Sequence, residues 1–168
     1  NNKITSPTYN RGTGQILFPA STDQTANFQG RSVEDVLVFK PSGTLKFAGD
    51  MTSDSLIAEW GELDFNGKNI TTTGNFEIRE QADMLSTNLS GTDIVVGGDA
   101  YLWGQPGNLM DIDSTANWTY TVTGTAQAFY VNAGNSDAGG GSTVYAYHSF
   151  DALDNTNWVF AKIYAQDS

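Results

Sequence analysis

Apolar residues in this chain recur at every second position in short runs, and turns rich in glycine, asparagine and threonine separate the runs. TLKFAG places Leu45 and Phe47 on one face of an extended segment, and WTYTV does the same with Trp118, Tyr120 and Val122. Alternation with a period of two is the pattern of a β-strand that buries one face. No long segment has a helical period, so the pattern predicts an all-β protein.

Several further segments have the composition of strands, with β-branched and aromatic residues bounded by turn formers. They are QILF, SVEDVLVFK, SLIAEW, TVYAYHSF and NTNWVFAKIYA. VEDVL and REQADML contain helix-forming residues, and each could make one short helical turn. QPGN is predicted to be a turn and NAGNSDAGGGS a flexible loop.

One pattern occurs twice. LDFNGKNITTTGNFEI, which begins at Leu63, aligns with TNLSGTDIVVGGDAYL, which begins at Thr87. The aligned pairs are Ile70 with Ile94, Thr72 with Val96, Gly74 with Gly98, Phe76 with Ala100, and Ile78 with Leu102. Polar residues between these positions differ between the two copies. The repeated property is therefore packing and turning rather than chemistry.

Glycines follow the same spacing. In the first series an apolar residue lies two positions before each glycine, at Gly30, Gly49, Gly67 and Gly91. The second series consists of Gly74, Gly98 and Gly124. The resulting period, in the low twenties, is typical of one coil of a parallel β-solenoid, whose coils bury their inner faces by stacking. An antiparallel β-sandwich or jelly roll with equal hairpins would give similar spacings. The short β-helix is favoured because turn and strand repeat together.

The N-terminal segment differs from the rest of the chain. Residues 1–30 are predicted to be an extended assembly arm, and residues 31–168 a β-rich repeat domain. Within the arm, Ile16, Leu17 and Phe18 form a short apolar run. Such a run is a candidate strand for docking on another sheet, so these three residues are candidate assembly residues. The alternative is a first strand of the domain's own core.

The amino-acid composition argues against several kinds of site and binding partner. Without cysteine, the chain has no disulfide or thiolate metal site. A net charge of −11 argues against nucleic acid and anionic membrane surfaces as partners. No apolar run approaches the roughly 18 residues of a membrane span, so membrane insertion is not expected. Acidic chains rich in threonine, asparagine and glycine are typical of extracellular and viral surface proteins, so we expect an extracellular, cell-surface or virion location.

The segments LDFNGKNITTTGNF and TANWTYTVTGTAQAFYVNAGNSDAGGGSTVYAYHSFDALDNTNWVF carry a resemblance to known proteins. The first resembles the repeats of bacterial surface adhesins and phage-associated fibre proteins with right-handed parallel β-helices. The second is similar to the closing unit of that group. The resemblance covers roughly residues 44 to 160. It implies surface display, adhesion or assembly, and it brings no catalytic residues with it.

Catalytic patterns are weak. The one histidine, His148, lies in the alternating segment TVYAYHSF and is expected to point outward from a strand. Glu59, Glu62 and Asp64 surround Trp60, and two acids beside an aromatic ring would suit an enzyme that cleaves polysaccharides. Basic residues for an anionic sugar are few, so a solvated acidic face is the favoured interpretation.

Two kinds of binding site remain as candidates. Trp60 and Trp103 could form a platform for sugar rings, although tryptophans also fill cores. Carboxylate and amide oxygens that could bind calcium are found at Asn108, Asp111, Asp113 and Asp137. The full EF-hand spacing is absent, and no other cofactor is expected.

These observations favour a non-enzymatic structural or adhesive subunit of a virion or an extracellular surface assembly. It would self-associate as a homo-oligomer or filament through its β-rich body and N-terminal arm, or bind other surface proteins. The alternatives are a carbohydrate-binding module, with glycans as partners, and a small polysaccharide-acting enzyme.

Overall fold

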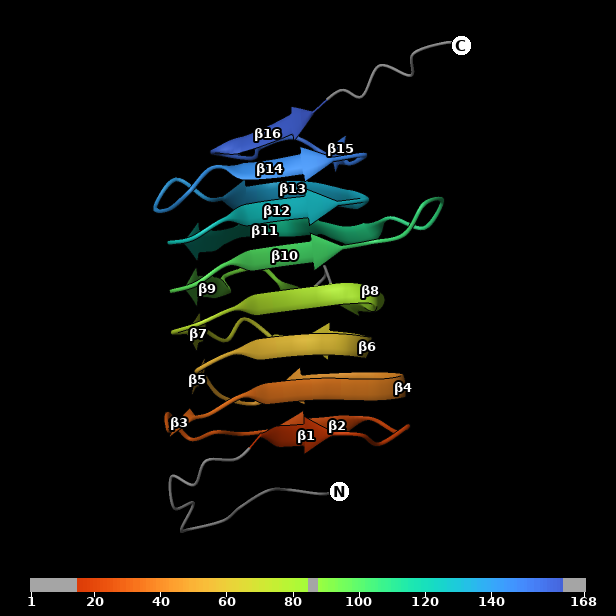
Figure 1. Cartoon of the computed structure of the whole chain (residues 1–168), viewed down its shortest axis with the longest axis vertical. Helices are drawn as coiled ribbons and strands as arrows, with labels where there is room; N and C mark the ends of the chain where they lie inside the picture. Colours follow the sequence, from red (N-terminus) through yellow and green to blue (C-terminus); the bar gives the residue numbers. More distant parts are fainter. Residues whose placement is uncertain (1–14, 85–87, 162–168) are drawn as a thin grey trace.

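The chain forms a parallel β-solenoid in which each coil lies on the one before it (Figure 1). The computed structural model describes residues 15–84 and 88–161. All strand pairs between these elements are parallel, which excludes the antiparallel sandwich. The solenoid predicted from the repeat is therefore confirmed.

Two sheets contain all the strands. The nine-stranded sheet consists of β1 (Ile16–Phe18), β2 (Gln24–Ala26), β4 (Val36–Phe47), β6 (Leu56–Asp64), β8 (Phe76–Met84), β10 (Ala100–Trp103), β12 (Ala126–Phe129), β14 (Val144–Tyr147) and β16 (Trp158–Ala161). The seven-stranded sheet consists of β3 (Ser32–Val33), β5 (Met51–Ser53), β7 (Ile70–Thr72), β9 (Asp93–Val96), β11 (Met110–Val122), β13 (Val131–Asp137) and β15 (Phe150–Asp151).

The sequence repeat and the spatial register agree. Ile70 of β7 pairs with Ile94 of β9, and Phe76 of β8 pairs with Ala100 of β10. Where these strands pair, a residue of the first copy therefore lies directly beside its counterpart in the second. The repeat exists because both copies must present apolar side chains to the same interior at the same height.

The coils change in length along the stack. Leu56 pairs with Phe76, and Phe76 pairs in turn with Ala100, so the second of these two coils is longer than the first. Near the C-terminus Val144 pairs with Trp158, and this step along the chain is shorter than either of the other two. The predicted period thus describes the central coils, whereas the last coil falls below it.

Long strands turn a corner within a coil. β4 pairs with β1 through Val36–Val38 and with β2 through Leu45–Phe47. Between these parts Gly43 has a φ of +83°, a conformation that side chains rarely adopt. One continuous strand therefore contributes to two faces of the solenoid.

A single apolar core runs through all the described coils. Phenylalanines stack along it, with ring centroids 6.1 Å apart between Phe28 and Phe47 and 5.2 Å apart between Phe47 and Phe65. Trp118 and Tyr120 are buried too, as the alternation of WTYTV predicted. Every coil adds inward residues to this column, and burying them is the main driving force for stacking.

Lys40 is a buried charge in the first coils. Its Nζ donates to the carbonyls of Ala20 at 2.9 Å and Thr22 at 2.6 Å, and to Oε1 of Gln24 at 3.3 Å. Burial lowers the pKa of this ammonium, and the charge of Asp23 opposes the shift. Lys40 thereby ties the loop between β1 and β2 to the body of the solenoid.

The apolar run Ile16–Phe18 is β1, and it pairs in parallel with β4 of the same chain. Phe18 is buried in the common core. In this structure the run is therefore a strand of the domain's own core, which was the alternative to a strand that docks on another sheet. The predicted boundary after residue 30 falls inside the first coil, between β2 and β3, and residues 1–14 of the predicted arm lie outside the described residues.

Both predicted helical turns are wrong within the described residues. REQADM belongs to β8, and VEDVL lies across the end of β3 and the start of β4. Pairing with the neighbouring coils outweighs the weak helix propensity of these short segments. Among the described residues, no helix is long and apolar enough to cross a membrane.

The predictions for the QPGN turn, for the NAGNSDAGGGS loop and for His148 had different outcomes. QPGN is a turn, closed by reciprocal backbone hydrogen bonds between Gln105 and Asn108, and Figure 1 shows the loop that carries it projecting from the stack. NAGNSDAGGGS is not a loop throughout, because its first part belongs to β13. His148 lies in a turn after β14 rather than in a strand, with a φ of 51° and its ring stacked on Tyr130.

Candidate functional site

The outer surface of the nine-stranded sheet carries an unusual number of aromatic residues. We call the set Phe39, Trp60, Trp103, Phe129 and Tyr147 the outer stripe. Phe39 pairs with Trp60 between β4 and β6, and Trp103, Phe129 and Tyr147 pair in turn between β10, β12 and β14. Stacking of the coils thus lines up side chains that are far apart in the sequence.

A cleft of about 540 Å³ interrupts the outer stripe at β8. Trp60 borders it from β6, and Tyr101 and Trp103 border it from β10. The strand between them, β8, supplies polar side chains to the cleft. The cleft therefore combines aromatic walls with a polar floor.

The aromatic walls are supported from behind. The indole of Trp103 stacks on Phe129 with centroids 4.3 Å apart and planes 13° apart, and Phe129 stacks on Tyr147 at 5.0 Å. On the other wall, Trp60 contacts Phe39 at 5.6 Å. Both supports lie on the sides away from β8, and both indoles line the cleft. These contacts hold the rings in place before any ligand binds. Little side-chain entropy would therefore be lost on binding.

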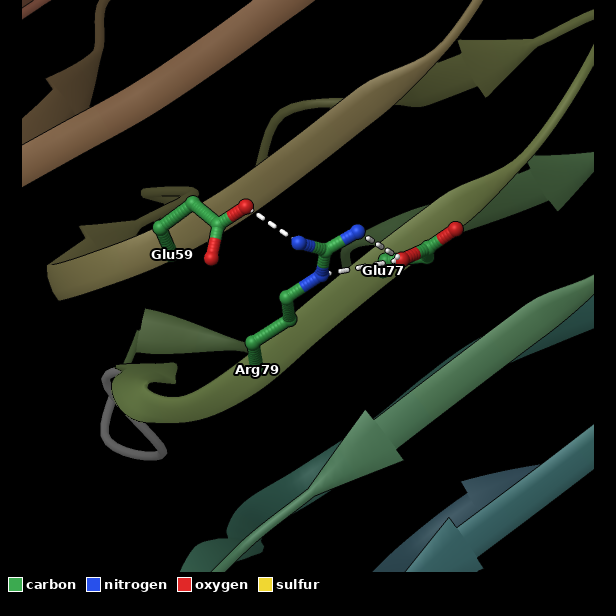
Figure 2. Close-up of polar contacts among 3 residues, drawn as sticks. All are labelled: Glu59, Glu77 and Arg79. Carbon is green, nitrogen blue, oxygen red and sulfur yellow. Dashed lines mark hydrogen bonds and ion pairs between the residues drawn. The ribbon is translucent and has the colours of Figure 1, made fainter.

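Arg79 occupies the floor (Figure 2). Its Nε and Nη2 donate to Oε2 of Glu77 at 3.1 and 2.9 Å, and its Nη1 donates to Oε1 of Glu59 on β6. The guanidinium is held between two carboxylates from neighbouring coils. It is a rigid polar group rather than a mobile charge.

A bulge explains why so many polar groups face the cleft. Ala58 pairs with Ile78 and Trp60 with Gln81, so two steps along β6 correspond to three along β8. The extra residue breaks the alternation of β8, and Arg79, Glu80 and Gln81 all line the cleft. Regular alternation would have turned one of the three inward.

The structure brings together both predicted sugar-platform residues, Trp60 and Trp103, and adds Glu59 from the predicted acidic set. It does not bring Glu62 and Asp64 into the cleft. Glu62 accepts a hydrogen bond from Thr44 at 2.7 Å. Asp64 is buried, accepts from Asn88 at 2.9 Å and pairs with Lys46 at 3.4 Å.

Glu77, Arg79 and Glu80 were not among the site residues predicted from the sequence. The signal in FEIREQADM is the run of three polar residues REQ, which breaks the apolar alternation of a strand. Helix propensity offered a competing explanation for the same residues. Only the pairing register identifies the run as a bulge that faces outward.

The predicted calcium ligands have hydrogen-bond partners within the chain. Asp111 on β11 accepts from Asn132 at 2.9 Å and from the backbone of Asp113 at 3.2 Å. Asp137 ends β13 and accepts from the backbone of Gly139, whereas Asn108 belongs to the QPGN turn. Within residues 15–84 and 88–161, no three acidic, histidine or cysteine side chains group together as a metal site would require.

A smaller cavity of about 230 Å³ lies between β8 and the loop before β11. Asp83 lines it, although the residue as a whole is exposed. Desolvation, and to a lesser extent the charges of Glu62 and Asp111, raise the pKa of Asp83 to about 6, while a hydrogen bond from the backbone of Met84 opposes the shift. Within the described residues β8 pairs with β10 only through Phe76–Ile78, so the part of β8 that borders this cavity has no strand partner on that side.

No protein-family model, curated protein or solved structure matches this chain. The resemblance to surface adhesins and fibre proteins stays an expectation at the level of family. The parallel β-solenoid that it implied is the fold of this chain.

Proposed function

We propose that this protein is a non-enzymatic adhesion module of an extracellular, cell-surface or virion assembly, and that it binds carbohydrate in the cleft between Trp60 and Trp103. One observation carries the proposal. Two indoles that are far apart in the sequence border a single open cleft whose floor is polar.

Carbohydrates suit this combination of groups. A pyranose ring presents an apolar C–H face that packs on an aromatic ring, and its edge carries hydroxyl groups that need hydrogen-bond partners. Trp60 and Trp103 supply the aromatic surfaces, and Arg79, Glu80 and Gln81 supply donors and acceptors. The outer stripe extends the aromatic surface beyond the cleft, as adhesion to a polymer would require.

The arrangement of acids favours binding over hydrolysis. Hydrolysis of a glycosidic bond uses two carboxyl groups that flank the bond. Glu59 and Glu77 instead share one guanidinium, and their oxygens orient Arg79. Glu62 and Asp64, the other acids of the predicted set, have partners elsewhere.

Binding of the purified protein to a panel of polysaccharides, measured by affinity electrophoresis and calorimetry, tests the proposal. Trp60→Ala and Trp103→Ala should each weaken binding about tenfold, which corresponds to about 1.4 kcal/mol. Tyr145→Ala removes an exposed aromatic residue of the same sheet outside the cleft and should leave binding unchanged. Full binding by both tryptophan variants, or release of shorter sugars from the polymer, would contradict it.

A second observation supports the expected self-association. The C-terminal coil exposes Phe150, Leu153 and Val159, with 61%, 68% and 45% of their surfaces accessible. Within the described residues, β15 and β16 are the last strands of their sheets and pair on one side only. An unpaired strand edge next to apolar side chains is a template for another chain. We propose that copies associate through this end.

A further inference from the structure

The charge of the cleft restricts its ligand. Glu59, Glu77 and Glu80 line it together with Arg79, so three carboxylates and one guanidinium give a formal charge of −2. The chain as a whole, cleft included, carries a net charge of −11. An anionic ligand would therefore approach a negative cleft on a negative molecule.

The single basic group of the cleft is already compensated. Among the described residues that line it, only Arg79 is basic. Three of its N–H groups are used, with Nε and Nη2 bonded to Glu77 and Nη1 bonded to Glu59. A uronate or sulfate that reached the guanidinium would lie beside the carboxylates of Glu59 and Glu77, and their repulsion would oppose its binding.

Hydroxyl groups face no such barrier. A guanidinium has five N–H donors, so two remain for the oxygens of a ligand. Glu80 and Gln81 at the floor can accept hydroxyl protons. The hydrogen-bonding capacity that is left is that of a site for uncharged, hydroxyl-rich rings.

We propose that the cleft selects glycans without negative charge and rejects acidic ones. The inference rests on the carbohydrate binding proposed above and names the class of ligand at that site. Sugar rings would pack on Trp60 and Trp103 while their hydroxyls bond to Arg79, Glu80 and Gln81. Polymers rich in uronate, sulfate or sialic acid would be repelled.

Matched pairs of polymers test the selection. Polygalacturonate, alginate and hyaluronate are each compared with the same polymer after reduction of its carboxyl groups, alongside neutral mannan, xylan, galactan and β-glucan. Binding should be at least about tenfold tighter to neutral than to acidic polymers. The affinity for neutral polymers should change little between about 0.01 and 1 M NaCl.

Two other results are distinguishable. Tighter binding to acidic polymers, lost as salt rises, would overturn the selection and leave carbohydrate binding intact. Absence of binding to every polymer would overturn both proposals.

A charge-reversal variant provides a positive test. The triple variant Glu59→Gln, Glu77→Gln, Glu80→Gln releases Arg79 and changes the formal charge of the cleft from −2 to +1. Affinity for polygalacturonate should rise at least about tenfold. If the triple variant does not fold, Glu80→Gln alone should raise that affinity about two- to fivefold, since one exposed charge contributes under ~1 kcal/mol.

The control carries the same change of net charge elsewhere. Asp35→Asn, Asp113→Asn and Asp154→Asn alter three exposed acids outside the cleft. This variant should bind acidic polymers as weakly as the native chain. Equal affinity of the two triple variants for polygalacturonate would overturn the inference.

Discussion

Arg79 and Asp83 lie four positions apart on β8, and neighbouring carboxylates affect them in opposite ways. Glu59 and Glu77 stabilise the guanidinium of Arg79 through direct bonds. Asp83 lines the smaller cavity, where desolvation, and to a lesser extent the charges of Glu62 and Asp111, raise its pKa to about 6. Neighbouring carboxylates therefore hold the charge of Arg79 in place, whereas at Asp83 other carboxylates add to a cost of ionisation that comes mainly from desolvation.

This shift predicts a pH dependence of stability. The pKa of Asp83 is higher in the folded chain than its ordinary value of 3.8, so between about pH 4 and 6 the folded state binds more protons than the unfolded one. The contribution of Asp83 to the free energy of unfolding is fully present below about pH 4. It is lost as the pH rises through about 6.

Replacing the charge should remove this cost. Asp83→Asn should raise the melting temperature at neutral pH by about 1–3 °C, since a partly exposed charge contributes under ~1 kcal/mol. At pH 4 the variant and the native chain should melt together. Thermal unfolding followed by circular dichroism between pH 4 and 8 measures both. Asp113→Asn, an exposed acid of equal charge, is the control, and an equal gain from it would contradict the prediction.

Part of the candidate site was predictable from the sequence at the level of residues. Trp60 and Trp103 could be named because tryptophans in polar, alternating segments are recognisable in the sequence. Arg79 could not, since its importance depends on Glu59 from a different coil. In the sequence Arg79 is one of several consecutive polar residues, and nothing in that run indicates that the fold places it against Glu59.

At the scale of elements, the second glycine series is a column. Gly98 donates its backbone N–H to the carbonyl of Gly74 at 3.0 Å, and Gly124 donates to Gly98 at 3.0 Å. A Cβ at Gly98 would lie 2.8 Å from the carbonyl carbon of Gly74 and 2.7 Å from the side chain of Asn75. The turns stack this closely only because none of the three carries a side chain.

This contact predicts an effect of one added methyl group. Gly98→Ala should lower the free energy of unfolding by about 1–3 kcal/mol, because backbone atoms cannot move aside cheaply. Unfolding in urea measures the change. Gly107→Asn is the control, since Gly107 has open space around it and a φ of +79°, which asparagine tolerates. Equal destabilisation by both substitutions would contradict the steric explanation.

The elements were predictable where their pattern is periodic. The register of Ile70 with Ile94 could be read from the repeat, because inward positions of stacked coils must all be apolar. The strand REQADM was missed, because a short segment without apolar alternation is decided by its neighbours in space. Pairing with β6 supplies the hydrogen bonds that a helical turn would have made within itself.

At the scale of the whole molecule, charge and shape act against each other. The net charge of −11 repels copies of the chain, while within the described residues the C-terminal coil exposes apolar side chains and strand edges that pair on one side only. Repulsion between exposed charges is screened by salt, and apolar contact is not. The balance predicts that self-association depends on ionic strength.

Sedimentation velocity should therefore show larger species as NaCl rises from about 0.01 to about 1 M. Leu153→Asp removes apolar surface from the exposed end and should keep the protein smaller at high salt. Leu109→Asp is the control, because Leu109 is exposed in the loop before β11, away from that end. A single species at every salt concentration, or equal effects of both substitutions, would contradict association through this end.

The sequence by itself determined the solenoid and the register of its central coils. Stacking of coils requires alternating apolar residues and regularly spaced glycines. These requirements are local and periodic, so they recur in the sequence of each copy of the repeat. The tertiary structure alone decided what the outer surface presents. Trp60 and Trp103 meet at one cleft because coil lengths and the bulge in β8 set which outward side chains become neighbours. The spacing between Trp60 and Trp103 depends on the length and turns of every segment between them. No local sequence pattern specifies that spacing.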